Sequence, residues 1–248
     1  MSFSMSLGMC FELLGDFMEQ NIFSRINSFV NSTRDVLYLR KDDLLLIIRP
    51  NRIQHVNDTA FDMLHSLYAA GMDAESVASS ISEKYGVERN LVLRDLSETI
   101  NTVNALMKED YKSATVSTMI NYDPSLIKFP ILSEIALTYR CQNRCEFCYA
   151  SSPYRGKEMR EMSTAEVYTV IDRICDEAKV PTISFTGGEP TLREDLPLLI
   201  KYAADKGMRT NLIKNGIKSS NMDFVKSLAD AGLDSAQVSL ESHDPDLH

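Results

Sequence analysis

The sequence predicts an α/β protein in which a small α+β domain precedes a parallel sheet. From residue 131 onward, short β-type segments alternate with amphipathic helical segments, and this alternation indicates parallel strands, in an open sheet or closed into a barrel. Before that point, three strand-like segments are followed by three helical ones without alternation. A chain of 248 residues, 44% of them hydrophobic, is long enough for one or two domains with substantial cores.

Composition and charge exclude several classes of protein. With 25% charged residues, 10 Gly and 8 Pro, the chain is neither collagen-like nor wholly disordered. A net charge of −9 argues against a nucleic-acid partner. The longest aliphatic run, Leu44 to Ile48, is far shorter than the roughly 20 residues that span a bilayer, so no membrane partner is expected. Acidic residues precede the first basic residue, Arg25, which is unlike a secretory signal, and we expect a cytoplasmic protein.

The first domain is predicted over residues 36–111, after an N-terminal extension, residues 1–35, that shows only a weak helical pattern. Turn residues separate the three expected strands, Val36–Arg40, Leu44–Arg49 and Arg52–Asn57. The three expected helices are Thr59–Ala70 with Asp58 as its N-cap, Ala74–Tyr85 with Asp73 as its N-cap, and Asn90–Met107. Gly71 and Gly86 are natural C-terminal stops.

A polar segment without periodicity, residues 112–130, is expected to link this domain to the second one, and we place the boundary near residue 115. The second domain, residues 131–248, contains expected strands at Glu134–Thr138, Thr182–Phe185, Arg209–Ile213 and Ser235–Leu240. Helices near Ala165–Ala178, Asp195–Asp205 and Met222–Ala231 separate them. Ligands of parallel sheets bind at the carboxyl ends of the strands, and polar clusters of this domain fall there.

Three of the five cysteines lie within eight residues, at Cys141, Cys145 and Cys148. Their C-x3-C-x2-C spacing follows the first predicted strand on a polar stretch that suits a loop. Three thiolates lack the fourth ligand of a structural zinc site, but they can hold three corners of a 4Fe-4S cluster and leave one iron open. A zinc site completed by a distant residue, or three cysteines on a buried helix face, remain alternatives. Isolated Cys10 and Cys175 and the histidines His55 and His65 are given no chemical role.

Each later strand of this domain also ends in a polar motif. Thr186-Gly187-Gly188-Glu189-Pro190 follows the second strand, and its two glycines allow a close backbone approach. Lys214-Asn215-Gly216 follows the third strand, and it could equally be a plain tight turn. Val238-Ser239-Leu240-Glu241-Ser242 ends the fourth, where Ser239 could instead be a strand serine with local hydrogen bonds.

The cysteine loop, with Phe147 before its last cysteine, resembles the signature of the radical S-adenosylmethionine (SAM) superfamily, and the Gly187-Gly188-Glu189-Pro190 motif is similar to a second family signature. The resemblance implies a partial (β/α)6 radical SAM barrel, of which the first four β/α units are present. It further implies that the three cysteines hold a 4Fe-4S cluster and that Glu189 accepts hydrogen bonds from the ammonium group of SAM. The residues that it assigns to SAM binding are Phe147, Gly187, Gly188, Glu189, Asn215, Ser239 and Glu241.

Two positions depart from the family pattern. Lys214 stands where the family has threonine before Asn-Gly, and Glu241-Ser242 stands where it has Asp-Gly. The resemblance also implies the reaction: the reduced cluster cleaves SAM to a 5′-deoxyadenosyl radical, and the protein binds and orients the reactants. An electron donor such as flavodoxin or ferredoxin is expected.

The first domain resembles the PqqD-like domain, a winged-helix-like module that binds the leader of a precursor peptide in many peptide-modifying pathways. The similarity lies in Leu44–Pro50, Asn57–Phe61 and Val77–Tyr85. It implies that a leader peptide adds as a strand to the sheet edge. DNA binding, which the acidic helices disfavour, and a purely structural cap are the alternatives.

Both resemblances together point to radical SAM enzymes related to the pyrroloquinoline quinone and thioether-peptide maturases, many of which carry a cysteine-rich SPASM region. Because this sequence lacks those cysteines and stops after the fourth predicted strand, we expect it to be a fragment. The expected function is modification of a peptide or cofactor precursor. The alternatives are a radical SAM enzyme acting on a small metabolite and a non-catalytic, metal-containing module that binds a peptide or protein.

Overall fold

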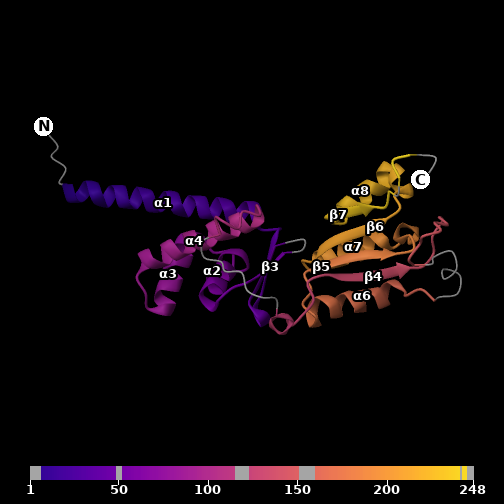
Figure 1. The fold of residues 1–248 in the computed structure, drawn as a ribbon, viewed down its shortest axis with the longest axis horizontal. Helices are drawn as coiled ribbons and strands as arrows, with labels where there is room; N and C mark the ends of the chain where they lie inside the picture. Colours follow the sequence, from indigo (N-terminus) through magenta and orange to yellow (C-terminus); the bar gives the residue numbers. More distant parts are fainter. Residues whose placement is uncertain (1–6, 49–51, 115–122, 151–159, 241, 245–248) are drawn as a thin grey trace. The chain divides into compact units, whose positions relative to one another are not determined.

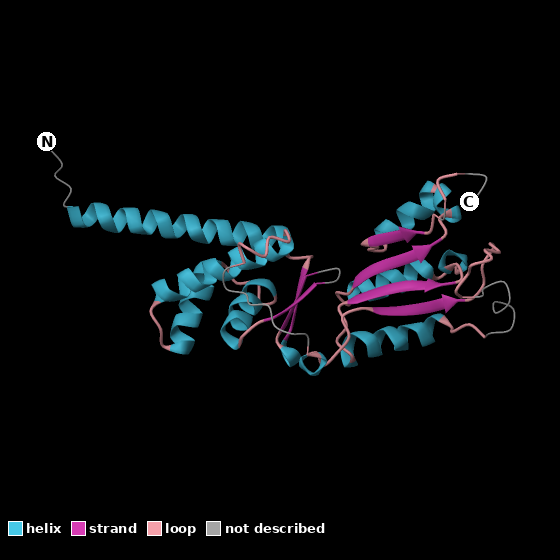
Figure 2. Cartoon of the chain, viewed as in Figure 1, coloured by secondary structure: helices cyan, strands magenta, loops and turns pink. Residues whose placement is uncertain are grey.

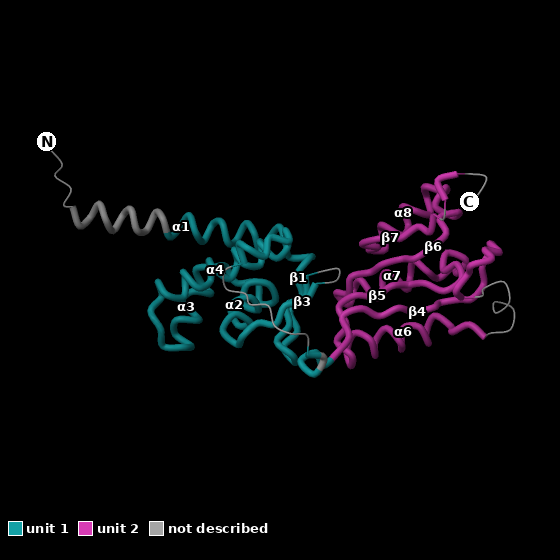
Figure 3. The backbone as a smooth tube through the Cα atoms, viewed as in Figure 1, with its two compact units in different colours: residues 1–128 teal, residues 129–248 magenta. Residues whose placement is uncertain are grey.

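The computed structural model describes residues 7–48, 52–114, 123–150, 160–240 and 242–244, with the backbone alone described over residues 7–18. The chain divides into two compact units, residues 1–128 and residues 129–248 (Figure 3). Each unit has its own hydrophobic core. None of the described helices has the length and apolar character needed to cross a membrane.

Unit 1 combines a three-stranded antiparallel sheet with four α-helices (Figure 1). The strands β1 (Leu37–Arg40), β2 (Leu45–Ile48) and β3 (Arg52–His55) lie in the order β1-β2-β3. The helices are α1 (Leu7–Thr33), α2 (Asp58–Tyr68), α3 (Ala74–Tyr85) and α4 (Arg89–Met107). The predicted strands and helices are therefore present, and α1 is a long helix where the sequence shows only a weak pattern.

Some helix termini of unit 1 differ from the prediction: α2 ends at Tyr68 rather than Ala70, α4 begins at Arg89 rather than Asn90, and the N-cap of α2 is another residue. Asn57, not Asp58, caps α2, because the Asn57 side chain accepts a hydrogen bond of 2.8 Å from the Ala60 backbone N–H. Asp73 caps α3 as predicted, and Gly86 ends it with a left-handed φ of 64°. Apolar side chains of the sheet and the helices meet in the core, where Leu46, Leu64 and Leu96 are fully buried.

A buried ion pair ties the end of unit 1 to its sheet. The Arg40 guanidinium donates to both carboxylate oxygens of Asp43 at 2.9 and 3.0 Å, and both side chains are almost fully buried. Asp43 also accepts the Lys128 backbone N–H at 3.0 Å. The predicted linker, residues 112–130, thus ends in a segment anchored to unit 1, which explains why the contact boundary lies after Lys128 rather than near residue 115.

Unit 2 is built on a four-stranded parallel sheet with strand order β4-β5-β6-β7 (Figure 2). The strands are β4 (Ser133–Thr138), β5 (Thr182–Gly187), β6 (Arg209–Lys214) and β7 (Ser235–Val238). The α-helices are α6 (Thr164–Asp172), α7 (Leu196–Asp205) and α8 (Met222–Asp230), and a π-helical turn, η3 (Arg173–Glu177), extends α6. Short 3-10 turns, η4 (Pro190–Leu192) and η5 (Ile217–Ser220), follow β5 and β6.

The two faces of this sheet differ in polarity. Ile183, Phe185 and Leu212 alternate onto one face and pack into the core with residues of α6 and α7. On the other face, Asn211 donates to the Ser184 hydroxyl at 3.1 Å and accepts from the Ser235 hydroxyl at 2.9 Å. Because these three residues are register partners, they form one polar row across β5, β6 and β7. The unit is a mixed α/β domain whose helices cover the apolar face.

Candidate functional site

The carboxyl ends of the four parallel strands bring the sequence motifs to one edge of unit 2 (Figure 1). Cys141 comes shortly after β4, the Gly188-Glu189 pair follows β5, Asn215 follows β6 and Ser239 follows β7. Neighbouring strands in the sheet therefore present neighbouring motifs. This is the edge at which parallel α/β sheets bind their ligands.

Two glycines allow the β5 turn to lie directly against the chain that leads to Cys141. The Gly188 backbone N–H donates to the Thr138 carbonyl at 2.7 Å, and the Glu189 N–H donates to the Arg140 carbonyl at 2.8 Å. A Cβ atom on Gly188 would lie 2.4 Å from the Arg140 carbonyl oxygen. Gly187 has φ 131° and would meet the Thr138 carbonyl oxygen at 2.1 Å. Both positions require glycine for steric reasons.

Glu189 is fully buried, and its carboxylate joins two elements of the site. One oxygen accepts the Thr191 backbone N–H at 3.1 Å and the Thr191 hydroxyl, and the other accepts the Asn215 backbone N–H at 2.7 Å. The carboxylate thus fixes η4 to the turn after β6. Charge-assisted bonds of this kind are strong where water is excluded.

Asn215 lies beside the first cysteine of the loop. Its side-chain oxygen accepts the Ile217 N–H at 3.0 Å, and its amide nitrogen lies 4.0 Å from the Cys141 sulfur. Burial raises the pKa of the Cys141 thiol, an effect that the Asn143 N–H, 3.4 Å from the sulfur, partly offsets. Metal binding must therefore remove a proton from this thiol.

The rest of the cysteine loop is more exposed. Cys145 is exposed and Cys148 half-buried, and the Cys148 N–H donates to the Cys145 carbonyl at 3.2 Å. The Phe147 side chain is 66% exposed. Among the residues that the structure describes, no three His, Cys, Asp or Glu side chains lie close enough to hold a metal ion. The donor chemistry fits an iron–sulfur cluster, since three thiols stand on one irregular loop.

The end of β7 remains attached to β6. The Ser239 backbone N–H donates to the Lys214 carbonyl at 2.9 Å, which places Ser239 at the same edge. Lys214 is buried, and its ammonium group donates to the Ser219 hydroxyl in η5. The predicted Glu241 lies outside the described residues.

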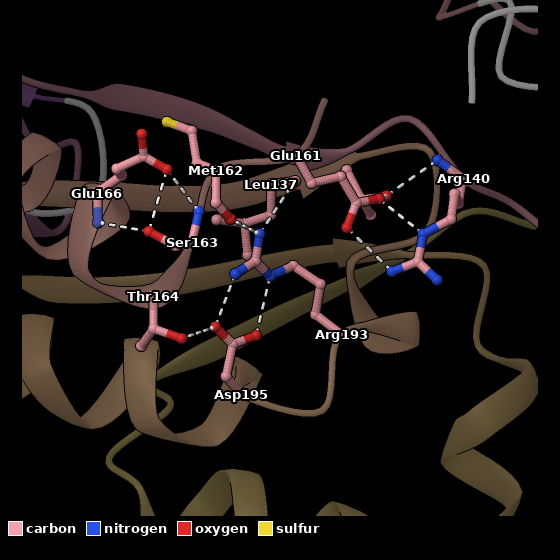
Figure 4. A network of polar contacts seen from close by, with 10 residues as sticks. Leu137, Arg140, Glu161, Met162, Ser163, Thr164, Glu166, Arg193 and Asp195 are labelled. Atoms are coloured by element: carbon pink, nitrogen blue, oxygen red, sulfur yellow. Dashed lines mark hydrogen bonds and ion pairs between the residues drawn. The ribbon is translucent and has the colours of Figure 1, made fainter. Parts of the chain in front are cut away.

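Sequence reasoning missed a network of charged residues behind the cysteine loop (Figure 4). The Arg140 guanidinium donates to both oxygens of Glu161, at 2.6 and 3.0 Å, and lowers the pKa of that carboxyl. The Arg193 guanidinium, only 6% exposed, pairs with Asp195 and lowers its pKa. No periodicity links residues 21 positions apart, such as Arg140 and Glu161, so the sequence held no signal for this network.

Arg193 also ties three segments together. Besides Asp195, it donates to the Leu137 carbonyl of β4 at 3.2 Å and to the Met162 carbonyl at 2.7 Å (Figure 4). Asp195 in turn accepts the Thr164 hydroxyl at 2.7 Å. The network thus holds β4, the segment before α6 and the start of α7 in one arrangement.

The fold and the donor set together define an α/β domain with a three-cysteine loop at the carboxyl edge of its sheet. Residues 135–248 match the model of the radical SAM superfamily. This part of the chain is therefore similar to radical SAM domains. Members of this superfamily are enzymes, and the family implies SAM and an iron–sulfur cluster as cofactors.

Individual relatives cover parts of the chain. A 7,8-dihydro-6-hydroxymethylpterin dimethyltransferase of Methanocaldococcus jannaschii is 41% identical over 105 residues, which are 42% of this chain and 21% of the relative. The crystal structure of Streptococcus suis SuiB matches 86% of this chain and 47% of its own, with 21% identity and a TM-score of 0.52. SuiB bound to its precursor peptide SuiA matches 86% and 48%, with 18% identity and a TM-score of 0.53. The chain thus spans about a fifth of the first relative and about half of SuiB, and at this identity the structural match concerns the fold alone.

Proposed function

We propose that this chain supplies the radical SAM site of an enzyme that modifies a peptide or a cofactor precursor. In this proposal Cys141, Cys145 and Cys148 hold a 4Fe-4S cluster whose fourth iron binds SAM. The observation that carries the proposal is the cysteine loop after β4, held by backbone hydrogen bonds to the Gly188-Glu189 turn after β5. A structural metal site has no need of this second motif.

The chain's own residues would place the reactants. When bound, the reduced cluster supplies the electron that splits SAM into methionine and a 5′-deoxyadenosyl radical, which takes a hydrogen atom from the substrate. Gly187 and Gly188 have no side chains, so the turn after β5 can lie directly against the backbone of Thr138 and Arg140. Asn215 and Ser239 stand at the ends of the neighbouring strands β6 and β7. The electron comes from a donor such as flavodoxin or ferredoxin.

Anaerobic reconstitution with iron and sulfide tests this proposal. The dithionite-reduced protein should give the electron paramagnetic resonance (EPR) signal of a 4Fe-4S cluster that changes when SAM is added, and 5′-deoxyadenosine should accumulate. Cys145→Ala should lose the signal, whereas Cys175→Ala, a matched change outside the loop, should keep it. Zinc binding in place of a cluster would contradict the proposal.

We further propose that unit 1 binds the peptide substrate or its leader. A cavity of about 430 Å³ lies between α4, the β2–β3 hairpin and the start of α2. Its α4 side is a helical stripe of Asp95, Glu98, Thr99, Thr102, Val103 and Leu106. The Thr102 hydroxyl is buried and has no hydrogen-bond partner among the described residues. A bound polar group would satisfy it, because buried hydroxyls normally have partners.

The edge of the sheet beside this cavity suits strand addition. β3 is the last strand in the order β1-β2-β3. The Val56 N–H donates to the Leu44 carbonyl at 2.9 Å, so the alternation of an antiparallel pair turns the N–H groups of Ile53 and His55 away from β2. An extended peptide can pair with such an edge while alternate side chains enter the cavity.

The charges around the cavity favour a basic peptide. Asp95 and Glu98 line it, and none of its described lining residues is lysine or arginine. A peptide of alternating valine and lysine should therefore bind unit 1 of the whole chain more tightly than one of valine and glutamate, by about tenfold at low salt. Fluorescence anisotropy with labelled peptides measures this difference.

A pair of variants tests whether the peptide binds at this cavity. Glu98→Gln should weaken binding of the valine–lysine peptide, whereas Glu83→Gln, an exposed change on α3, should not. Equal binding of both peptides would contradict the charge argument, and no binding of either would favour a small substrate. The identity to a pterin dimethyltransferase supports that second candidate, a small cofactor precursor as substrate.

A further inference from the structure

We propose that Glu161 is a positioning residue. It binds Thr138 and Arg140, the residues that lead into the cysteine loop, and thereby fixes the position of Cys141. The structure carries this inference in the contacts of Glu161 with both residues that lead into the loop. Its extension to the cluster rests on the proposed function, but its first test does not.

Glu161 links the two ends of the chain segment that contains the cysteines. It follows Cys148 in sequence and lies just before α6, yet it accepts the Thr138 hydroxyl and both guanidinium donors of Arg140. Thr138 is the last residue of β4, and Arg140 directly precedes Cys141. The side chain of Glu161 therefore ties the exit of the loop to its entrance.

The same two residues are also held by backbone hydrogen bonds. Thr138 accepts the Gly188 N–H, and Arg140 accepts the Glu189 N–H. The Thr138 hydroxyl also accepts the Arg140 N–H at 3.0 Å. Backbone hydrogen bonds and the Glu161 side chain therefore hold the entrance of the loop together.

The exit of the loop is anchored independently of Glu161. The neighbouring Met162 gives its carbonyl to the buried Arg193, which also holds the Leu137 carbonyl of β4. Removal of the Glu161 carboxylate should therefore loosen the entrance to the loop, which would still keep its backbone hydrogen bonds to Gly188 and Glu189, without unfolding α6 or β4. This separation makes the role testable.

Thiol alkylation of the metal-free protein is the first test. Iodoacetamide labelling followed by mass spectrometry gives the rate at each cysteine. In the native chain Cys141 should react slowly because it is half-buried beside Asn215. Glu161→Gln and Arg140→Gln should each raise its rate at least about threefold, since local release exposes the thiol.

The Glu161→Gln and Arg140→Gln variants remove charges of opposite sign, so they distinguish a movement of the loop from a purely electrostatic effect on the Cys141 thiol. Loss of the Glu161 charge favours the thiolate, and loss of the Arg140 charge disfavours it. A rise in both variants therefore reports movement of the loop, whereas a rise in one and a fall in the other would overturn the proposal. Arg140→Lys, which keeps the charge, should restore part of the native protection.

Two controls complete the design. Arg160→Gln removes the ion pair of Arg160 with Glu166 in the same segment and should leave the Cys141 rate unchanged. Cys175, remote in sequence and half-buried, should react at the native rate in every variant. A parallel rise at Cys175 would indicate general loosening and would count against the proposal, as would an unchanged Cys141 rate in Glu161→Ala.

The cluster-loaded protein gives the second test. Glu161→Gln should still assemble the cluster, but the SAM concentration that half-saturates the EPR change should rise about tenfold, a loss of about 1.4 kcal/mol of binding. An unchanged SAM dependence would show that Glu161 acts only in the metal-free protein, and it would overturn the extension of its role to SAM binding. If even the native chain assembles no cluster, the proposed function fails while the alkylation result stands by itself.

Discussion

Glu189 and Asn215 are joined across two neighbouring strand ends by a hydrogen bond of 2.7 Å from the Asn215 N–H to a carboxylate that is completely buried. The bond connects the turn after β5 with the turn after β6. It couples the two motifs that were recognised separately in the sequence.

Glu189→Gln should destabilise unit 2. A glutamine offers one oxygen where the carboxylate uses two, so either Asn215 or Thr191 loses its acceptor in a buried place. The expected cost is about 1–3 kcal/mol of unfolding free energy. Urea unfolding measures it, with Glu194→Gln, an exposed neighbour, as the control. Equal midpoints for the two variants would contradict the structural role.

Gly188→Ala should displace the entrance to the cysteine loop. The added Cβ would lie 2.4 Å from the Arg140 carbonyl oxygen and 2.8 Å from the Tyr139 carbonyl carbon, both of them backbone atoms. Overpacking of this kind costs about 1–3 kcal/mol. Thermal unfolding measures the loss of stability, and the cluster content after reconstitution measures the effect on the cysteine loop. Gly207→Ala is the comparison, because its φ of 78° is strained but nothing lies within 4 Å of its Cβ.

Arg193→Ala should be the most destabilising of these changes. The variant leaves the Asp195 carboxylate, 19% exposed, without its guanidinium, and leaves two backbone carbonyls without their donor. Loss of one partner from a buried pair costs about 3–5 kcal/mol. Calorimetry of the whole chain should show that Arg193→Ala lowers the unfolding temperature of unit 2 relative to the native chain and leaves that of unit 1 unchanged. Arg173→Ala, on η3, serves as the arginine control.

The stability of α6 should depend on pH through Glu166. Its carboxylate pairs with Arg160 and completes a capping box with Ser163, which lowers the Glu166 pKa from 4.5 to about 2. Since the pKa is lower in the folded state, the stabilisation is complete above about pH 4.5 and is lost as the pH falls toward 2. The melting temperatures of the native chain and Glu166→Gln should differ near pH 7 and converge near pH 2. A constant difference would contradict the linkage.

Much of the fold was predictable because periodicity and turn residues are local. The alternation of strands and helices predicts the parallel sheet, and Asp73 and Gly86 mark the ends of α3. The sequence could not show whether Asn57 or Asp58 caps α2, because both residue types are good N-caps. Only the backbone of the structure shows that Asn57 is the extended residue. The helix α1 was missed because its pattern is weakly amphipathic.

The candidate site was likewise predictable only in part. Motifs at strand ends could be placed together from the topology of a parallel sheet, and Cys141, Gly188, Glu189 and Asn215 do lie together. The buried role of Glu189 and the contacts of Arg140, Glu161 and Arg193 depend on side-chain packing between distant segments. No spacing rule describes such pairs, so only the structure could reveal them.

The row of Ser184, Asn211 and Ser235 has a consequence for folding. Side chains alternate between the faces of a strand, so a slip of one residue would turn Leu212 toward the polar face and Asn211 into the hydrocarbon core. Such a slip would break both side-chain hydrogen bonds of the row and bury an amide without partners. The row therefore discriminates against misaligned pairings of β5, β6 and β7, and it favours the one alignment in which the ends of these three strands meet at a common edge.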